Sequence, residues 1–108
     1  MSVDLSTFKP ANIVYLNDMF SHCFSLTSID LSNFDTSNVL YFYGMFSYCY
    51  NLTSIDISSF TLPTRTSYGD IFELFDNNLP KNGSIKINKE FYNRINNKWI
   101  EKWDITLV

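Results

Sequence analysis

Residues 19–34 and 45–60 read MFSHCFSLTSIDLSNF and MFSYCYNLTSIDISSF, two copies of one segment that are offset by 26 positions and identical at 11 of 16. A repeat of about 20–29 residues built around an LxxLxL pattern is typical of stacked repeat proteins. In such proteins each copy adds one rung, and neighbouring rungs bury a shared core. The repeat therefore predicts a solenoid, and it favours a function that uses an open surface.

Apolar and polar side chains alternate within each copy. Ile29 and Leu31 alternate with Ser28, Asp30 and Ser32. A strand places successive side chains on opposite faces, so this pattern predicts a short strand with an aliphatic face and a polar face. Stacked copies should form a parallel sheet whose inner face is aliphatic.

The same register continues on both sides of the two clear copies. Val3 and Leu5 occupy it earlier in the chain, and Ile85 and Ile87 occupy it later, after an insertion of four residues (87 − 57 = 30 rather than 26). We expect about four rungs in a single domain covering residues 1–108, with repeats in 1–80 and a closing unit in 81–108.

Apolar residues between the expected strands follow a helical spacing, which predicts short helices on the other face of the sheet. Thr36 or Ser37 is the expected N-cap of one of them, because a hydroxyl can accept from the free amides of the first turn. The positions with this spacing are Ile13, Leu16, Phe20 and Cys23 in one copy, and Val39, Phe42, Phe46 and Cys49 in the next.

The last part of the chain predicts an amphipathic helix followed by a strand. The helix is expected from the spacing of Phe91, Ile95, Trp99 and Trp103, and we expect it to cap the array. The residues around Ile105 form the expected last strand.

Composition and charge narrow the function classes. The chain has 108 residues, of which 45% are hydrophobic and 18% aromatic, so an ordered domain is expected. It contains no apolar run of about 18–20 residues and no secretory leader in residues 1–10, which indicates either a cytoplasmic protein or a piece of a longer exported one. The net charge of −3 divides into −6 for residues 1–80 and +3 for residues 81–108. The acidic repeats disfavour nucleic acid as a partner.

The segment from residue 12 to residue 60 resembles the leucine-rich repeats of BspA-type bacterial surface proteins, whose units run much like LTSIDLSNFDTSNVxxMxxMFxxCxxL. Residues 83–103, GSIKINKEFYNRINNKWIEKW, also look like the closing unit of such arrays. The resemblance implies an α/β leucine-rich-repeat solenoid used for adhesion or protein recognition, without catalytic residues or a cofactor.

Asp4, Asp30 and Asp56 occupy the same strand position, so their carboxylates should stack at about the 4.8 Å strand spacing. Paired carboxylates at such a distance serve retaining glycosidases, but catalysis also needs an enclosed pocket. A calcium ion between two of them is an alternative that would require further oxygen ligands. We interpret the column as a solvated acidic stripe with hydroxyl-to-carboxylate hydrogen bonds.

Cys23 and Cys49 share one apolar face and lie one repeat apart. A disulfide would require their Cβ atoms to approach to about 4 Å. Buried free thiols are the preferred interpretation.

Aromatic residues also repeat at positions that the core spacing does not require. At the offset of 26, His22 corresponds to Tyr48 and Phe24 to Tyr50. Tyrosine-rich surfaces often carry binding hot spots, although these rings could instead pack on one another.

We therefore expect a non-enzymatic module that binds a protein, namely a host or bacterial surface macromolecule, without a metal or cofactor. Alternatives are a structural unit that self-assembles through its N-terminal rung, and a small intracellular or viral inhibitor built on the same scaffold. A fragment of a longer protein would be secreted or displayed on the cell surface. The predicted contact residues are Ser28, Asp30, Ser32, Ser54, Asp56 and Ser58 on the strand face, and Tyr41, Tyr43, Tyr48 and Tyr50 in the aromatic columns.

Overall fold

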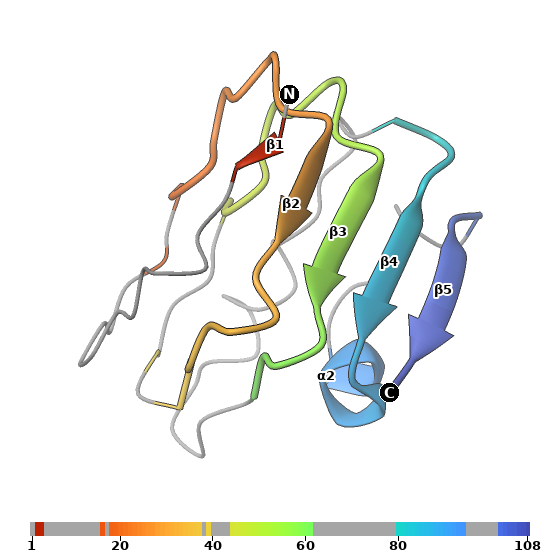
Figure 1. Ribbon diagram of the computed structural model, residues 1–108. Coiled ribbons are helices and arrows are strands. Elements are labelled where there is room, and N and C mark those ends of the chain that lie inside the picture. Colours follow the sequence, from red (N-terminus) through yellow and green to blue (C-terminus); the bar gives the residue numbers. More distant parts are fainter. Residues whose placement is uncertain are drawn as a thin grey trace.

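A computed structural model describes residues 2–3, 16, 18–37, 39, 44–61, 80–94 and 102–108. They form a five-stranded parallel sheet whose strands follow one another in chain order. Each copy of the repeat thus places its strand beside that of the preceding copy (Figure 1). The strands are β1 (Ser2–Val3), β2 (Ser28–Asp30), β3 (Ser54–Ile57), β4 (Ser84–Ile87) and β5 (Asp104–Leu107).

The register of the sheet confirms the alignment of the copies. Ile29 lies opposite Ile55, and Ile55 lies opposite Ile85, so the offsets of 26 and 30 both bring equivalent residues side by side. The four additional residues are therefore accommodated between β3 and β4. Ile105 continues the row opposite Ile85, which confirms the last strand expected from the sequence.

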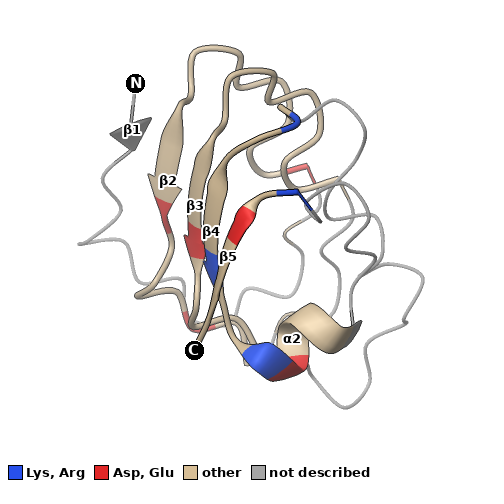
Figure 2. Ribbon diagram, turned by 90° about the vertical axis from the view of Figure 1, so that its right-hand side faces the viewer, with Lys and Arg blue, Asp and Glu red and all other residues tan. Residues whose placement is uncertain are grey.

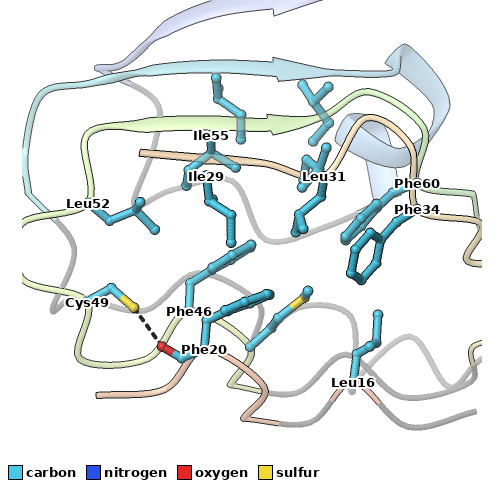
Figure 3. Packing of buried hydrophobic residues seen from close by; sticks show 14 of the residues in the cluster. Leu16, Phe20, Ile29, Leu31, Phe34, Phe46, Cys49, Leu52, Ile55 and Phe60 are labelled. Atoms are coloured by element: carbon cyan, nitrogen blue, oxygen red, sulfur yellow. Dashed lines mark hydrogen bonds between the residues drawn. The ribbon is translucent and has the colours of Figure 1, made fainter. Parts of the chain in front are cut away.

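The hydrophobic core lies on one face of this sheet. Ile29, Ile55 and Ile85 are all nearly inaccessible to solvent, as the alternating pattern predicts. Below them, the rings of Phe20 and Phe46 stack with centroids 6.0 Å apart and planes inclined by 10° (Figure 3). Aliphatic side chains from the strands and aromatic side chains from the connections thus repeat together from one copy to the next.

In the described parts of the first two connections, the backbone differs from the predicted helices. The helical spacing correctly identified buried residues such as Leu16 and Phe46, but residues 18–22 and 44–48 form turns. Each turn contains two residues in the left-handed region, with φ of 57° at Asp18, 63° at His22, 65° at Gly44 and 61° at Tyr48. A left-handed residue cannot continue a right-handed helix, so these positions close turns instead. Ile13 and Phe42 lie outside the described residues.

Thr36 has a different role from the predicted N-cap. It is the one polar residue among those described that is fully buried, and its Oγ1 accepts a hydrogen bond from the Thr61 amide at 2.9 Å. The same hydroxyl donates to the Thr61 carbonyl at 3.4 Å. Thr36 therefore joins two neighbouring copies rather than beginning a helix.

The one described helix, α2 (Lys89–Arg94), connects β4 to β5. Asn88 caps it, since its Oδ1 accepts from the Phe91 amide at 2.7 Å. The prediction that Trp103 belongs to this helix is wrong: Trp103 is buried just before β5, where its indole nitrogen donates to the Pro80 carbonyl at 2.9 Å. Because β5 forms the last strand, a closing helical cap is not evident in the described residues.

Figure 2 views the sheet from the side. The described turns and α2 lie on the core side, and the opposite face of β2 to β5 is not covered by any described element.

Candidate functional site

Two rows of polar residues cross the uncovered face of the sheet, which we call the strand face. In the first row, Ser28 lies opposite Ser54, Ser54 opposite Ser84, and Ser84 opposite Asp104. Because these residues alternate with the buried isoleucines, their side chains point away from the core. The first row is thus formed mainly of small hydroxyl groups.

The second row carries charges of both signs. Asp30 lies opposite Asp56, Asp56 opposite Lys86, and Lys86 opposite Thr106. Figure 2 shows the acidic positions of β2 and β3 and the basic position of β4 at one level of the sheet. The predicted acidic column therefore ends at β4, where an ammonium group follows two carboxylates. Asp4 lies outside the described residues.

The strand face contains a shallow hollow with a volume of about 470 Å³. The hollow spans four strands. The serine side chains are small and therefore leave space above the backbone of the neighbouring isoleucines Ile29, Ile55 and Ile85. Its lining consists of Ser28, Ile29, Asp30, Ser54, Ile55, Asp56, Ser84, Ile85, Lys86 and Thr106.

Hydrogen bonds within the copies position the two aspartates. Asp56 Oδ1 accepts from the Ser58 amide at 3.0 Å and from the Ser58 hydroxyl at 2.6 Å, and Asp30 Oδ1 accepts from the Ser32 amide at 2.9 Å. The predicted hydroxyl-to-carboxylate bond is therefore present at Asp56. These contacts close the turn after each strand, so Ser32 and Ser58 act as partners of the aspartates.

We also searched the described residues for side chains that could bind a metal ion. Within these residues, no group of three or more His, Cys, Asp or Glu side chains is arranged to hold a metal ion. The calcium alternative therefore gains no support from the described residues.

Four aromatic side chains form a second surface, which we call the aromatic cluster: His22, Phe24, Tyr48 and Tyr50. His22 stacks on Tyr48 with ring centroids 4.5 Å apart, and Phe24 stacks on Tyr50 at 5.4 Å. Within each copy the two rings are nearly perpendicular, at 5.8 Å in the first copy and 6.1 Å in the second. All four side chains are exposed.

The backbone of two adjacent turns holds the aromatic cluster in place. The His22 amide donates to the Ser47 carbonyl at 2.8 Å, and the side-chain amide of Asn51 donates to the Phe24 carbonyl at 2.6 Å. Figure 1 shows these two segments side by side beyond the N-terminal ends of β2 and β3. The cluster is therefore built by the repeat and does not depend on a single flexible loop.

Tyr48 and Tyr50, two of the four predicted tyrosines, belong to this cluster, whereas Tyr41 and Tyr43 lie outside the described residues. His22 and Phe24 complete it, although the sequence-based set of contact residues omitted them. The signal was their correspondence with Tyr48 and Tyr50 at the offset of 26.

Lys86 and Thr106 were likewise absent from the predicted strand face. Aligning SIDI of β3 with SIKI of β4 identifies Lys86, because the two segments differ only at that position. Thr106 follows from the register of β5.

Cys23 and Cys49 are not joined by a disulfide. Cys49 is fully buried, and its Sγ donates to the Phe20 carbonyl at 2.9 Å (Figure 3). Cys23 is partly buried. Cys49 is thus part of the core and bridges two copies.

Asp35, which lies after β2 in the sequence, has a perturbed pKa. The Ser37 hydroxyl and the Ser37 amide both donate to the carboxylate of Asp35 and lower its pKa below the ordinary value. Asp35 is exposed. Its carboxylate accepts from the amide of Ser37, two residues later, and this hydrogen bond closes a local turn.

Comparisons with known proteins place the chain in a family. Residues 1–82 match the family described as "Mycoplasma protein of unknown function, DUF285". No curated protein and no solved structure matches the chain. Within the described residues, no helix has the length and apolar character that crossing a bilayer requires. Since the match covers most of the 108 residues, the chain belongs to the DUF285 family.

Proposed function

We propose that this chain is a non-enzymatic recognition module that binds a protein partner through its strand face. The observation that carries the proposal is the pair of polar rows on the uncovered side of the sheet, with the hollow of about 470 Å³ between them. A broad surface that combines hydroxyls, three carboxylates and one ammonium suits a polypeptide, which offers hydrogen-bonding groups and charges of both signs. The aromatic cluster is the second contact surface of the module.

The proposed architecture is a leucine-rich-repeat solenoid of the BspA type. The repeat period, the chain-order parallel sheet and the matching isoleucine register support it. In such an array each rung contributes to one continuous face, so an extended partner can contact several copies at once.

The proposed partner is a surface macromolecule of a host or of a neighbouring bacterium, and the proposed process is adhesion. As part of a longer exported protein, the module would act at the cell surface or after secretion. In the cytoplasm, the same surface would serve an inhibitor of an intracellular or viral protein.

The test compares three forms of the immobilised chain in affinity capture from native host surface extracts, followed by quantitative mass spectrometry. Ser54→Arg fills the hollow at an exposed position of β3, and Asn93→Arg adds the same charge on α2 as a matched control. We expect Asn93→Arg to retain a protein that the unmodified chain captures, and Ser54→Arg to lose it by about tenfold or more, which corresponds to about 1.4 kcal/mol. Equal capture by both variants would refute the strand face as the contact surface.

Self-assembly is a second candidate. The sequence predicts it through the N-terminal rung, and exposed apolar residues near β5 offer another surface for it. Leu107 is 46% exposed and Val108 62% exposed, and an edge strand can pair with another chain. Sedimentation of the unmodified chain and of Leu107→Lys checks this candidate. A monomer at high concentration for both forms would refute it.

A further inference from the structure

The second row of the strand face carries its charges in a fixed order. Asp30 on β2 is followed by Asp56 on β3 and then by Lys86 on β4, because these residues lie opposite one another in the sheet (Figure 2). The side chains of Asp30 and Lys86 are exposed, and that of Asp56 is partly exposed. A partner that lies across the strands from β2 to β4 therefore meets two negative charges and then a positive one.

The spacing of these charges follows from the geometry of the sheet. Neighbouring strands lie about 4.8 Å apart, so the midpoint between Asp30 and Asp56 lies one and a half strand spacings, or about 7.2 Å, from the position of Lys86. An extended segment directs every second side chain to the same side, at intervals of about 6.8 Å. Two side chains separated by one residue therefore fit this distance, whereas adjacent side chains point to opposite sides.

The hollow provides room for the backbone of such a segment. Its volume is about 470 Å³, and it reaches from β2 to β5 over the small side chains of Ser28, Ser54 and Ser84. Asp30, Asp56 and Lys86 belong to the same lining. An extended segment that lies in the hollow across the strands thus presents alternate side chains to the second row.

Local hydrogen bonds fix the position of both carboxylates before a partner arrives. Asp56 accepts from the amide and the hydroxyl of Ser58, and Asp30 accepts from the amide of Ser32. These amide and hydroxyl donors are neutral, so they orient the carboxylates without cancelling their charge. Groups that are already positioned lose little conformational entropy on binding.

The other charges of the strand face leave this pattern accessible. Lys86 lies opposite Asp56, but a pair of charges at a protein surface contributes only about 0–1 kcal/mol, so a partner can exchange for it. Asp104 belongs to the serine row, where it lies opposite Ser84. A uniformly basic partner would place a cation on Lys86, and a uniformly acidic one would place an anion on the aspartates. A segment that carries both charges avoids both repulsions.

We infer that the strand face docks an extended segment of a partner protein in which one basic and one acidic residue are separated by a single residue. The basic side chain lies between Asp30 and Asp56, and the acidic side chain lies on Lys86. Arginine suits the first position, because its guanidinium has five donors and can contact two carboxylates at once. The inference deepens the proposed function and rests on it, since it names the charge pattern of the partner at the same surface.

The experiment is an NMR titration of the isotope-labelled full chain with short peptides whose termini are blocked. The segment can run across the strands in either direction, so the probes include both Arg-Ser-Glu and Glu-Ser-Arg. The matched controls have the same composition with the two charges adjacent, as Ser-Arg-Glu and Ser-Glu-Arg. We expect one spaced peptide to bind about threefold or more tightly than either control and to shift the amides of β2 to β4.

A charge reversal on the chain tests the role of Lys86. Lys86→Glu reverses the charge on β4, whereas Lys89→Glu makes the same change at an exposed position of α2, away from the strand face. We expect Lys86→Glu to shift the preference from the spaced peptide toward Arg-Ser-Arg by about three- to tenfold. Lys89→Glu should shift it by less than about twofold, which measures general charge attraction. Circular dichroism verifies that both variants fold.

Equal binding of the spaced and adjacent peptides would overturn the inference, and so would equal shifts of preference in the two variants. Absence of binding by every peptide, or amide shifts confined to the aromatic cluster, would overturn it as well.

Failure of the inference is distinguishable from failure of the strand-face proposal. If Ser54→Arg loses the captured partner while no peptide shows the spacing preference, the strand face remains the contact surface and only the charge pattern is wrong. Equal capture by Ser54→Arg and Asn93→Arg would refute the strand face as the contact surface, and the inference with it.

Discussion

The rings of His22 and Tyr48 stack with centroids 4.5 Å apart, although a full repeat separates the two residues. Both residues also have left-handed φ, at 63° and 61°. The repeat thus reproduces a backbone conformation as well as a side-chain position, and it does so at exposed aromatic residues.

The left-handed backbone at Tyr48 predicts an unusual order of stability between two substitutions. Tyr48→Gly and Tyr48→Ala both remove the ring, but alanine retains the steric cost of left-handed φ and glycine does not. We expect the glycine variant to have a free energy of unfolding about 1 kcal/mol larger than the alanine variant, measured by urea denaturation.

Glu90 provides the control for this prediction. It is exposed in the first turn of α2, where alanine should be more stable than glycine by about 0.5–1 kcal/mol. The same order of stability at both positions would contradict the role assigned to left-handed φ at Tyr48.

A side chain at Gly44 should destabilise the fold, because this residue has positive φ and a close neighbour. A Cβ atom at this position would overlap Oδ1 of Asp18, the equivalent residue of the preceding copy. We expect Gly44→Ala to lower the free energy of unfolding by about 1–3 kcal/mol.

A double-mutant cycle separates the two causes at Gly44. Asp18→Gly removes the contacted carboxylate, so it should recover the steric part of the loss and leave the part due to φ. Strictly additive effects of the two substitutions would show that the side chains do not meet.

Thr36→Val should destabilise the fold by leaving a backbone amide without a partner. The Thr61 amide donates to the Thr36 hydroxyl at 2.9 Å, and valine has the shape of threonine without an acceptor. This hydrogen bond is partly buried, so its loss should cost about 1 kcal/mol, at the lower end of the range for an unsatisfied donor. Chemical denaturation measures this loss.

Hydrogen exchange of the Thr61 amide identifies the cause of that loss. Thr36→Ser retains the hydroxyl and should preserve protection of the Thr61 amide, whereas Thr36→Val should accelerate its exchange. Equal exchange rates in the two variants would assign the destabilisation to packing.

The lowered pKa of Asp35 predicts that the free energy of unfolding decreases slightly at acid pH. The Ser37 hydroxyl and amide lower the pKa of Asp35 in the folded state, so its carboxylate stabilises the fold at pH values above the pKa of the unfolded chain. This contribution is lost as pH falls through the lower folded pKa. Acid should therefore destabilise the folded state.

Carbon NMR titration of the Asp35 carboxyl checks this interpretation. Ser37→Ala should raise its pKa toward the ordinary value, whereas Ser25→Ala, at another exposed serine, should leave it unchanged. An unaltered pKa in Ser37→Ala would show that the backbone amide alone is responsible.

The strands and their register could be predicted because the alternation of Ile29 and Leu31 with polar residues recurs at a fixed offset. The connections could not, since a spacing of three and four residues fits one face of a helix and also the buried side of successive turns. Residues with left-handed φ distinguish turns from a helix. Two of them, His22 and Tyr48, are aromatic, so the sequence has no glycine there that would predict a turn.

The candidate contact surfaces were predictable in part. The strand-face serines and aspartates follow from alternation alone, but the insertion before β4 obscured how Lys86 continues their row. Tyr48 and Tyr50 were identified, whereas the stacking that adds His22 and Phe24 depends on the lateral distance between two turns.

The sequence by itself determined which strand isoleucines of the repeats are buried and which strands are neighbours, because both depend on periodicity, and periodicity is a local property of the chain. Only the tertiary structure decided the turn conformations, the position of Trp103 and the composition of the aromatic cluster. These features arise where residues distant in sequence meet, and there hydrogen bonds and ring contacts between copies outweigh the local preferences of each residue.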